Sequence, residues 1–282
     1  MIEVNNCLII DTETNRNQEQ QTVLEIGAIL YSVKYQTMLS CGSSLLYVDP
    51  DTKNEAFLIN KIPIESTNTF VAKSYLIEWL VYAQIESDVI VAHNKSFDQP
   101  LVSDLPFAGF WDKPWLCTYK DFELFPEAYT GKRDLFSLAQ FYGIGINISH
   151  RAINDCLLLA EVFNRVPELP EQFRIAQLPM IEAVCPKSDE SLKEKGFRWD
   201  YQRQGWFKKD KDETFDFPTI KVTEDRHLFR ALVSYNDRQI AKDWGFLWDS
   251  DRKVWERLLS PQSIELIPFR VAQMVSELES NS

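Results

Sequence analysis

The stretch CLIIDTETN, residues 7–15, decides the fold of the first part of the chain. Four apolar residues run into Asp11, and Glu13 follows two positions later. An apolar run with β-branched residues predicts a buried strand, on which residues i and i+2 share a face. Asp11 and Glu13 are therefore expected side by side at the strand end, where two poorly solvated carboxylates repel each other. Because a divalent cation relieves that repulsion, the stretch predicts a metal site.

Further apolar runs predict the strands and helices around this site. The second strand, residues 23–33 (VLEIGAILYSV), follows a polar loop at 16–22 and is expected to be hydrogen-bonded to the first strand. This start predicts an antiparallel meander that opens a mixed sheet. Further strands are expected at 45–48, 89–92 and 115–118, and helices at 71–83, 98–105, 132–142 and 151–166.

Length and composition indicate a folded protein with one large domain or two ordinary ones. The chain has 282 residues, of which 45% are hydrophobic and 13% aromatic, so it can bury a sizeable core. Its five cysteines form no CxxC pair, which favours a reduced, cytoplasmic chain without structural zinc. We find neither an apolar run of about 18 residues nor a signal peptide, and expect no membrane contact.

The net charge of −12 argues against nucleic-acid binding until its distribution is considered. Residues 1–172 carry 12 Lys and Arg against 23 Asp and Glu, whereas residues 173–282 carry 18 against 19. The acidity thus lies in the part that holds the proposed metal ligands. An enzyme that meets phosphates through bound cations needs no basic surface at the reacting bond.

Two prolines predict a boundary after the last helix of this first part. Pro167 and Pro170 interrupt the helical pattern, and we place the domains at 1–168 and 169–282. The second domain contains an internal repeat, since residues 193–208 (KEKGFRWDYQRQGWFK) match residues 242–257 (KDWGFLWDSDRKVWER) at an offset of 49.

Each copy of the repeat is expected to form a small module, at about 180–210 and 229–259. The pattern predicts a helix capped by glycine, a strand GFxWD, a turn, and a second strand that ends on tryptophan. Phe197 and Trp199 stand two positions apart, which places both on one face of the hairpin. Two such modules are expected to pack together.

Three later residues supply the donors that the metal site still needs. Asp98 lies in VIVAHNKSFDQPLV, just past a buried strand. Asp155 lies in SHRAINDCLLLAEVF, on the last helix of the first domain, and His150 precedes it by five residues. His150 is thus expected to reach the site from a loop, while the helix fixes Asp155.

These segments resemble a known family. IIDTETN with LEIGAI, then AHNKSFD, then HRAINDCLLLA are similar, in order and spacing, to the signature blocks of DnaQ-like 3′→5′ exonucleases of the DEDDh type. PWLCTYKDFELFP and the LFSLAQFYGI helix resemble exodeoxyribonuclease X-like proteins. The resemblance covers about residues 5–166 and implies an α/β, RNase H-like mixed sheet flanked by helices. A smaller α+β region with two repeats is expected to follow.

The resemblance also implies the chemistry. Asp11, Glu13, Asp98 and Asp155 would bind two Mg²⁺ or Mn²⁺ ions, with Asp11 bridging both, and His150 would be the general base. Two cations can clamp a scissile phosphate, one activating water and the other stabilising the leaving 3′ oxygen. With an ordinary pKa of about 6.5, histidine can take the proton of that water near neutral pH. The implied reaction releases nucleoside monophosphates from single-stranded or frayed 3′ ends of DNA.

Other residues near these motifs have two interpretations each. His93 and Asn94 more often shape the turn after their strand than touch a ligand. Phe97 either stacks on a base or packs in the core, and Glu25 either supports the ligands or caps a sheet edge. The repeat aromatics either form small cores or stack on single-stranded nucleic acid. The candidate nucleic-acid-binding residues are Phe97, Asn94, Arg198, Trp199, Arg203 and Arg252.

Two alternatives to a DNA exonuclease stay open. The first is an exoribonuclease that uses the same site, because discrimination depends on how a pocket meets the 2′ position. The second is a binding module with weak nuclease activity in a DNA-processing assembly. In that case the C-terminal repeats would contact a protein partner.

Overall fold

The computed structural model describes residues 1–17, 21–68, 73–105, 111–126, 129, 131–146, 150–223 and 225–274. The chain divides into two compact units, residues 1–177 (unit 1) and residues 178–282 (unit 2). Each unit is described by itself. Among the described residues, no helix combines the length and apolarity needed to cross a bilayer.

Unit 1 is built on a mixed five-stranded sheet with the strand order β3-β2-β1-β4-β5. Strands β1 to β3 form an antiparallel meander, and β4 and β5 run parallel to β1. The predicted mixed sheet is therefore confirmed. The strands are β1 (Asn6–Thr14), β2 (Val23–Ser32), β3 (Thr37–Leu45), β4 (Val89–Ala92) and β5 (Trp115–Cys117).

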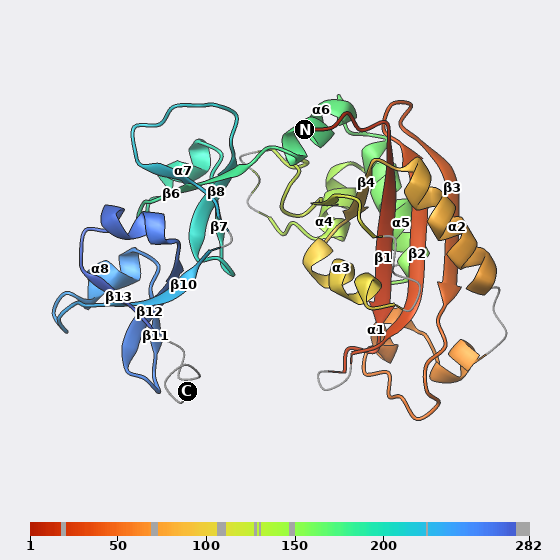
Figure 1. Cartoon of the computed structure of the whole chain (residues 1–282), viewed down its shortest axis with the longest axis horizontal. Helices are drawn as coiled ribbons and strands as arrows, with labels where there is room; N and C mark the ends of the chain where they lie inside the picture. The colour runs from red at the N-terminus through yellow and green to blue at the C-terminus, as the bar shows by residue number, and fades with distance from the viewer. Residues whose placement is uncertain are drawn as a thin grey trace. The chain divides into compact units, whose positions relative to one another are not determined.

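Helices cover both faces of this sheet (Figure 1), which explains why residues 7–10 of β1 are an unbroken apolar run. Cys7 and Ile9 pack in a core with the α5 residues Leu159 and Phe163. Leu8 and Ile10 point to the other face, into a core that includes residues of α2 and α3. The helices of unit 1 are α1 (Phe57–Asn60), η1 (Ile64–Asn68, a 3₁₀ turn), α2 (Lys73–Glu86), α3 (Lys95–Ser103), α4 (Leu135–Phe141), α5 (Ala152–Phe163) and α6 (Leu169–Ala176).

The third strand differs from its prediction at 45–48. β3 is the edge strand of the sheet, and most of its side chains are partly or fully exposed, so its sequence lacks the apolar run that marks a buried strand. Val48 is apolar for another reason, because it packs with Leu24 and Ile62 in a small separate core. Residues 18–20, 71–72 and 147–149 of the predicted loops and helix lie outside the described residues.

The two prolines after α5 do not end unit 1. Pro170 stands in the first turn of α6, where its missing N–H costs no helical bond. Leu169, Phe173 and Ala176 of α6 belong to the main core of unit 1, and the Phe173 ring contacts Phe122 and Phe163. The boundary between the compact units therefore falls after Gln177, nine residues beyond the predicted position.

Unit 2 contains two four-stranded antiparallel sheets with the same topology. Their strand orders are β7-β8-β6-β9 and β11-β12-β10-β13, so corresponding strands hold corresponding places. The internal repeat of the sequence is thus a repeat of the fold. The elements are β6 (Met180–Ala183), α7 (Ser191–Glu194), β7 (Arg198–Asp200), β8 (Gly205–Lys209), β9 (Thr219–Lys221), β10 (His227–Ala231), α8 (Arg238–Asp243), β11 (Leu247–Asp249), β12 (Val254–Leu259), η2 (Pro261–Leu266) and β13 (Val271–Gln273).

Both copies show the predicted glycine cap and hairpin. Gly196 and Gly245 follow their helices with φ of 80° and 79°, a left-handed conformation that suits glycine. Trp199 pairs with Trp206 across the first hairpin, and Trp248 pairs with Trp255 across the second. The expected strand end is wrong, because Trp206 is the second residue of β8 and the strand continues to Lys209.

The two copies contact each other through a buried ionic cluster. Glu182 of the first copy is 1% exposed and accepts a hydrogen bond from Arg226 at 2.6 Å. Arg257 of the second copy lies 3.6 Å from the same carboxylate and donates to the carbonyl oxygen of Gln204 at 2.6 Å. A Cβ on Gly245 would lie 2.5 Å from the Trp199 ring, so the second copy covers that ring closely.

Candidate metal centre

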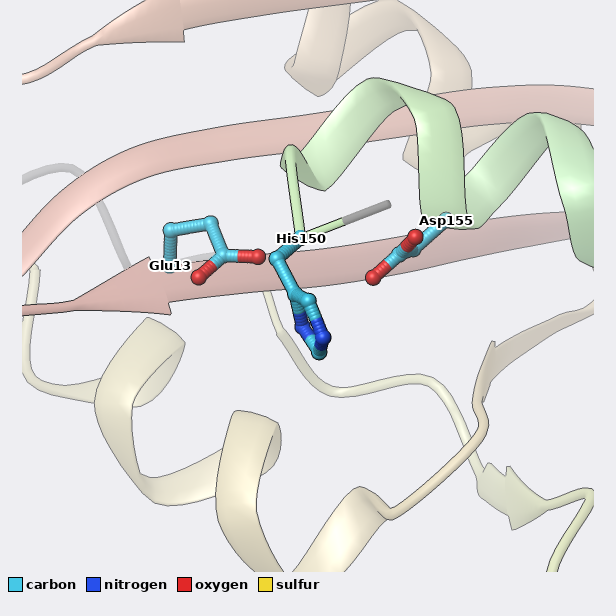
Figure 2. Close-up of side chains that lie close together, drawn as sticks. All are labelled: Glu13, His150 and Asp155. Atoms are coloured by element: carbon cyan, nitrogen blue, oxygen red, sulfur yellow. The ribbon is translucent and has the colours of Figure 1, made fainter. Parts of the chain in front are cut away.

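Glu13, His150 and Asp155 come together at the end of β1. Each offers one ligand atom, and these atoms lie within 4.8 Å of one another. Figure 2 shows His150 between the two carboxylates, with Glu13 on β1 and Asp155 on α5. Three of the five predicted site residues, which are far apart in sequence, thus form one cluster that could hold a metal ion.

Strand geometry explains why β1 presents two acidic residues to α5. Asp11 and Glu13 continue the odd-numbered face of β1, which buries Cys7 and Ile9 in the core shared with α5. Thr12 points to the opposite face, where its N–H and hydroxyl donate to Oδ1 of Asp98 at 3.0 and 2.8 Å. Asp98, in the first turn of α3, is therefore tied to β1 between the two acidic residues.

Burial, and after it the charges of neighbouring carboxylates, raises the pKa of the acidic residues in the cluster. Burial, followed by the charges of Asp98, Asp155 and Glu13, holds the pKa of Asp11 well above its ordinary value. Burial also raises the pKa of Glu13 to about 7, of Asp98 to about 7 and of Asp155 to about 6. The site therefore concentrates negative charge that the protein alone does not neutralise.

His150 is held against this cluster by its backbone and by an aromatic neighbour. Its φ of 58° lies in the left-handed region, which non-glycine residues rarely adopt. Its ring contacts Phe136 of α4 edge-on, with the ring centroids 5.2 Å apart. Burial, and next the charge of Arg16, lowers its pKa below 6.5, so the imidazole is neutral at pH 7 and can accept a proton.

The residues of the cluster fit a divalent cation. Oδ1 of Asp155 is buried without a hydrogen-bond partner among the described residues, although carboxylate oxygens inside proteins are normally paired. Carboxylate oxygens are the donors that Mg²⁺ and Mn²⁺ prefer. A cation bound there would satisfy this oxygen and offset the repulsion that raises the neighbouring pKa values.

The other predicted contact residues lie in varied surroundings. Asn94 and Phe97 are exposed at the start of α3, next to Asp98, and Phe97 is 37% exposed. In unit 2, Trp199 lies beneath Gly245, and Arg203 lies over the Phe207 ring.

The remaining unit 2 residues differ in their accessibility. Arg252 is paired with Asp249 and Glu256, and Arg198 is half-buried on β7. Trp248, the counterpart of Trp199, is 51% exposed. The two tryptophans therefore have similar sequence contexts, but Trp248 is more open to a bound strand or protein than Trp199 is.

Two residues next to the predicted ligands were missed in the sequence. Thr12 holds Asp98, and Arg151 forms a two-pronged ion pair with Glu25 at 2.8 and 2.7 Å. Adjacency was the available signal, because Thr12 stands between two predicted ligands and Arg151 follows His150. His93 is engaged with Thr118 and Tyr119, in agreement with a structural role.

Comparisons with known proteins give a family match to part of unit 2 and a set of similar solved structures. A family model described as a domain of unknown function, DUF8626, matches residues 227–274, the second copy of the repeat. No curated protein gives a significant match to the chain. Similar solved structures are nevertheless found.

The zinc-bound E. coli exonuclease I–ssDNA complex is 12% identical, with a TM-score of 0.52, over 94% of this chain and 68% of that one. A second exonuclease I structure, whose title concerns processivity, is 10% identical with a TM-score of 0.53 over the same shares. Exonuclease X with 5′-overhanging duplex DNA is 25% identical, with a TM-score of 0.43, over 60% and 99% of the two chains. The likeness to exonuclease I confirms the expected RNase H-like fold.

Proposed function

We propose that the chain is a metal-dependent 3′→5′ exonuclease that hydrolyses DNA at single-stranded or frayed 3′ ends. The observation that carries this proposal is the convergence of ligand atoms of Glu13, His150 and Asp155 within 4.8 Å, with the partly buried Asp11 and the buried Asp98 close enough to affect their charge. Four carboxylates and a histidine on this fold match the donor set of the DEDDh resemblance. The similar E. coli protein is described in complex with single-stranded DNA, which favours DNA as the substrate.

Asp11, Glu13, Asp98 and Asp155 would hold two Mg²⁺ or Mn²⁺ ions. When bound, such cations polarise the phosphate and lower the pKa of a coordinated water. Asp155 is the best-placed ligand, because α5 fixes it and its Oδ1 lacks another partner among the described residues. Asp98 keeps one oxygen engaged with Thr12, so its second oxygen would face the cation site.

His150 would take the proton from the attacking water. Its lowered pKa leaves the imidazole neutral at pH 7, the state that accepts a proton. The Phe136 ring and the left-handed backbone limit the positions of the imidazole. Glu13, on the other side of His150, would orient the water or the terminal 3′ hydroxyl.

Unit 2 would bind the strand or a protein partner outside the reacting site. Its exposed Trp248 offers a ring on which a base can stack, although the nearby Arg252 is paired with acidic residues. We therefore assign the binding of long substrates to unit 2 and their hydrolysis to unit 1.

The test is digestion of labelled oligonucleotides. Single-stranded DNA, duplex DNA and RNA, each labelled at the 3′ or 5′ end, are incubated with Mg²⁺ or Mn²⁺. We expect stepwise loss of mononucleotides from the 3′ end of DNA, abolished by Asp155→Asn. Asp51→Asn, which changes an exposed carboxylate outside the site, is the matched control.

Each other outcome has a defined meaning. Digestion of RNA in preference to DNA would change the proposed substrate to RNA and leave the proposed mechanism as it is. Absence of digestion for every substrate, with folded protein and both metals, would overturn the exonuclease assignment and favour a binding module.

A further inference from the structure

Glu25 is a buried carboxylate beside the cluster that cannot serve as a free ligand. It stands opposite Glu13 in the pairing of β1 with β2, and it is 2% exposed. Its oxygens accept hydrogen bonds from Nε and Nη2 of Arg151 and from the N–H of Ala152, at 2.8, 2.7 and 3.0 Å. With the Ser43 hydroxyl, which donates to Oε1 at 3.4 Å, four donors occupy this carboxylate, whereas Oδ1 of Asp155 has no partner within the part of the chain that the structure describes.

The residues bound by Glu25 connect the two later members of the cluster. Arg151 follows His150 directly, and Ala152 is the first residue of α5, which carries Asp155 in its first turn. A carboxylate that accepts a hydrogen bond from the first N–H of a helix also stabilises the helix, because its negative charge faces the positive end of the helix dipole. One side chain of β2 therefore fixes both the segment of His150 and the start of the helix of Asp155.

A second feature of β2 places the same helix end. A Cβ on Gly27 would lie 2.4 Å from the backbone nitrogen of Ile153 and 2.5 Å from the carbonyl carbon of Ala152. Only glycine lets the strand and the helix approach this closely. Gly27 sets the distance between β2 and α5, and the pairing of Glu25 with Arg151 sets how the helix end is anchored.

We propose that Glu25 and Arg151 are positioning residues that hold His150 and Asp155 in register with Glu13. The proposal rests on the function proposed above for its kinetic readout, but its structural readout is independent of activity. The two parallel bonds are essential to it, because a guanidinium binds a carboxylate through a rigid fork and an ammonium does not. Arg151→Lys therefore keeps the charge and loses the fixed geometry.

The test compares Arg151→Lys with Arg165→Lys in the full chain. Arg165 follows the other end of α5 and forms an exposed ion pair with Glu161, so it is a matched control for an arginine next to the same helix. For Arg151→Lys we expect kcat to fall at least about tenfold with KM within about twofold, because misplaced catalytic groups affect the reacting step. Arg165→Lys should keep both constants.

Histidine NMR supplies the readout that needs no activity. The chain has three histidines, so ring-labelled protein gives few signals, and His150→Ala assigns the relevant one. In the metal-free protein at one fixed pH, Arg151→Lys should shift and broaden the His150 signal and leave those of His93 and His227 in place. Glu25→Gln, which keeps the shape of the side chain, should reproduce the effect.

The outcomes separate this proposal from the exonuclease assignment. An unmoved His150 signal in Arg151→Lys would overturn the positioning role whether or not the protein is a nuclease, and a parental kcat in that variant would overturn it if the protein is one. A shifted His150 signal in a protein that digests no substrate would support the positioning role and reject the exonuclease assignment. If Glu25→Gln fails to fold, Arg151→Lys still decides the question.

Discussion

Asp155→Asn should stabilise the metal-free protein while it abolishes activity. Burial raises the pKa of Asp155 from 3.8 to about 6, so the folded protein binds this proton more tightly than the unfolded chain does. The free energy of unfolding therefore falls as pH rises from about 4 to about 6, and the loss is complete above that range. The gap between the two pKa values corresponds to at most about 3 kcal/mol at pH 8.

The asparagine keeps the shape of the side chain and removes the charge. Its oxygen can still accept the hydrogen bond from the His150 backbone, and its NH₂ group can face the Glu13 carboxylate. A gain of about 2–3 kcal/mol in a unit of this size raises Tm by about 5–10 °C. The rise should shrink as pH falls towards 4, because the aspartic acid is then neutral in the folded protein as well.

The assay is thermal unfolding at pH 8 with EDTA, and again with Mg²⁺. Parent protein should gain Tm on addition of Mg²⁺ through binding, whereas Asp155→Asn should gain little. Asp51→Asn should behave as the parent in both conditions. A Tm in EDTA that is unchanged or lowered by Asp155→Asn would refute the idea that the buried charge of Asp155 destabilises the metal-free protein.

Three further predictions concern separate parts of the chain. His150→Ala should bind Mn²⁺ with near-parental affinity in electron paramagnetic resonance titrations and lose at least about tenfold in rate at neutral pH; near-normal turnover would reject the base assignment. A chain ending at Gln177 should melt cooperatively and cleave short oligonucleotides while binding long ones more weakly, whereas a chain ending at Pro170 should melt lower, because it lacks the buried Phe173; equal melting of the two would contradict the packing of α6. Glu182→Gln should destabilise unit 2 by about 3 kcal/mol, because it leaves Arg226 and Arg257 without their counter-charge. The measurement is urea unfolding followed by tryptophan fluorescence, and an unchanged midpoint would show that the ionic cluster does not stabilise unit 2.

The sheet and the candidate ligands could be predicted because both depend on local patterns. The apolar run before Asp11 is unbroken since β1 is buried on both faces, and strand period alone places Asp11 and Glu13 on one side. Asp98 and Asp155 stand in distinctive contexts that strand and helix signals already locate. The edge strand β3 was misplaced because it is exposed, and the helix α6 was missed because prolines stand before it and in its first turn.

The sequence offered two roles for Glu25, support of the predicted ligands or capping of a sheet edge, and its neighbours in the chain could not decide between them. Its meaning depends on the pairing register of β1 with β2 and on Arg151, which is 126 residues away in sequence. The two repeat tryptophans show the same limit. Trp199 and Trp248 occupy equivalent places in matching motifs, and only the packing of the second copy on the first makes their exposure differ.

The two copies of the module in unit 2 differ in the buried cation that caps their helices. In each copy, a buried cation donates to the carbonyl of the residue before the capping glycine: Lys208 to Lys195, and Arg257 to Trp244. Lys208 also forms an ion pair with Glu213, next to its own strand, whereas Arg257 also reaches Gln204 and the Glu182 carboxylate of the other copy. If the copies exchanged places, the hydrogen bond within each copy would remain, but the contacts of Arg257 with Gln204 and Glu182 would be lost. The two modules are therefore not interchangeable.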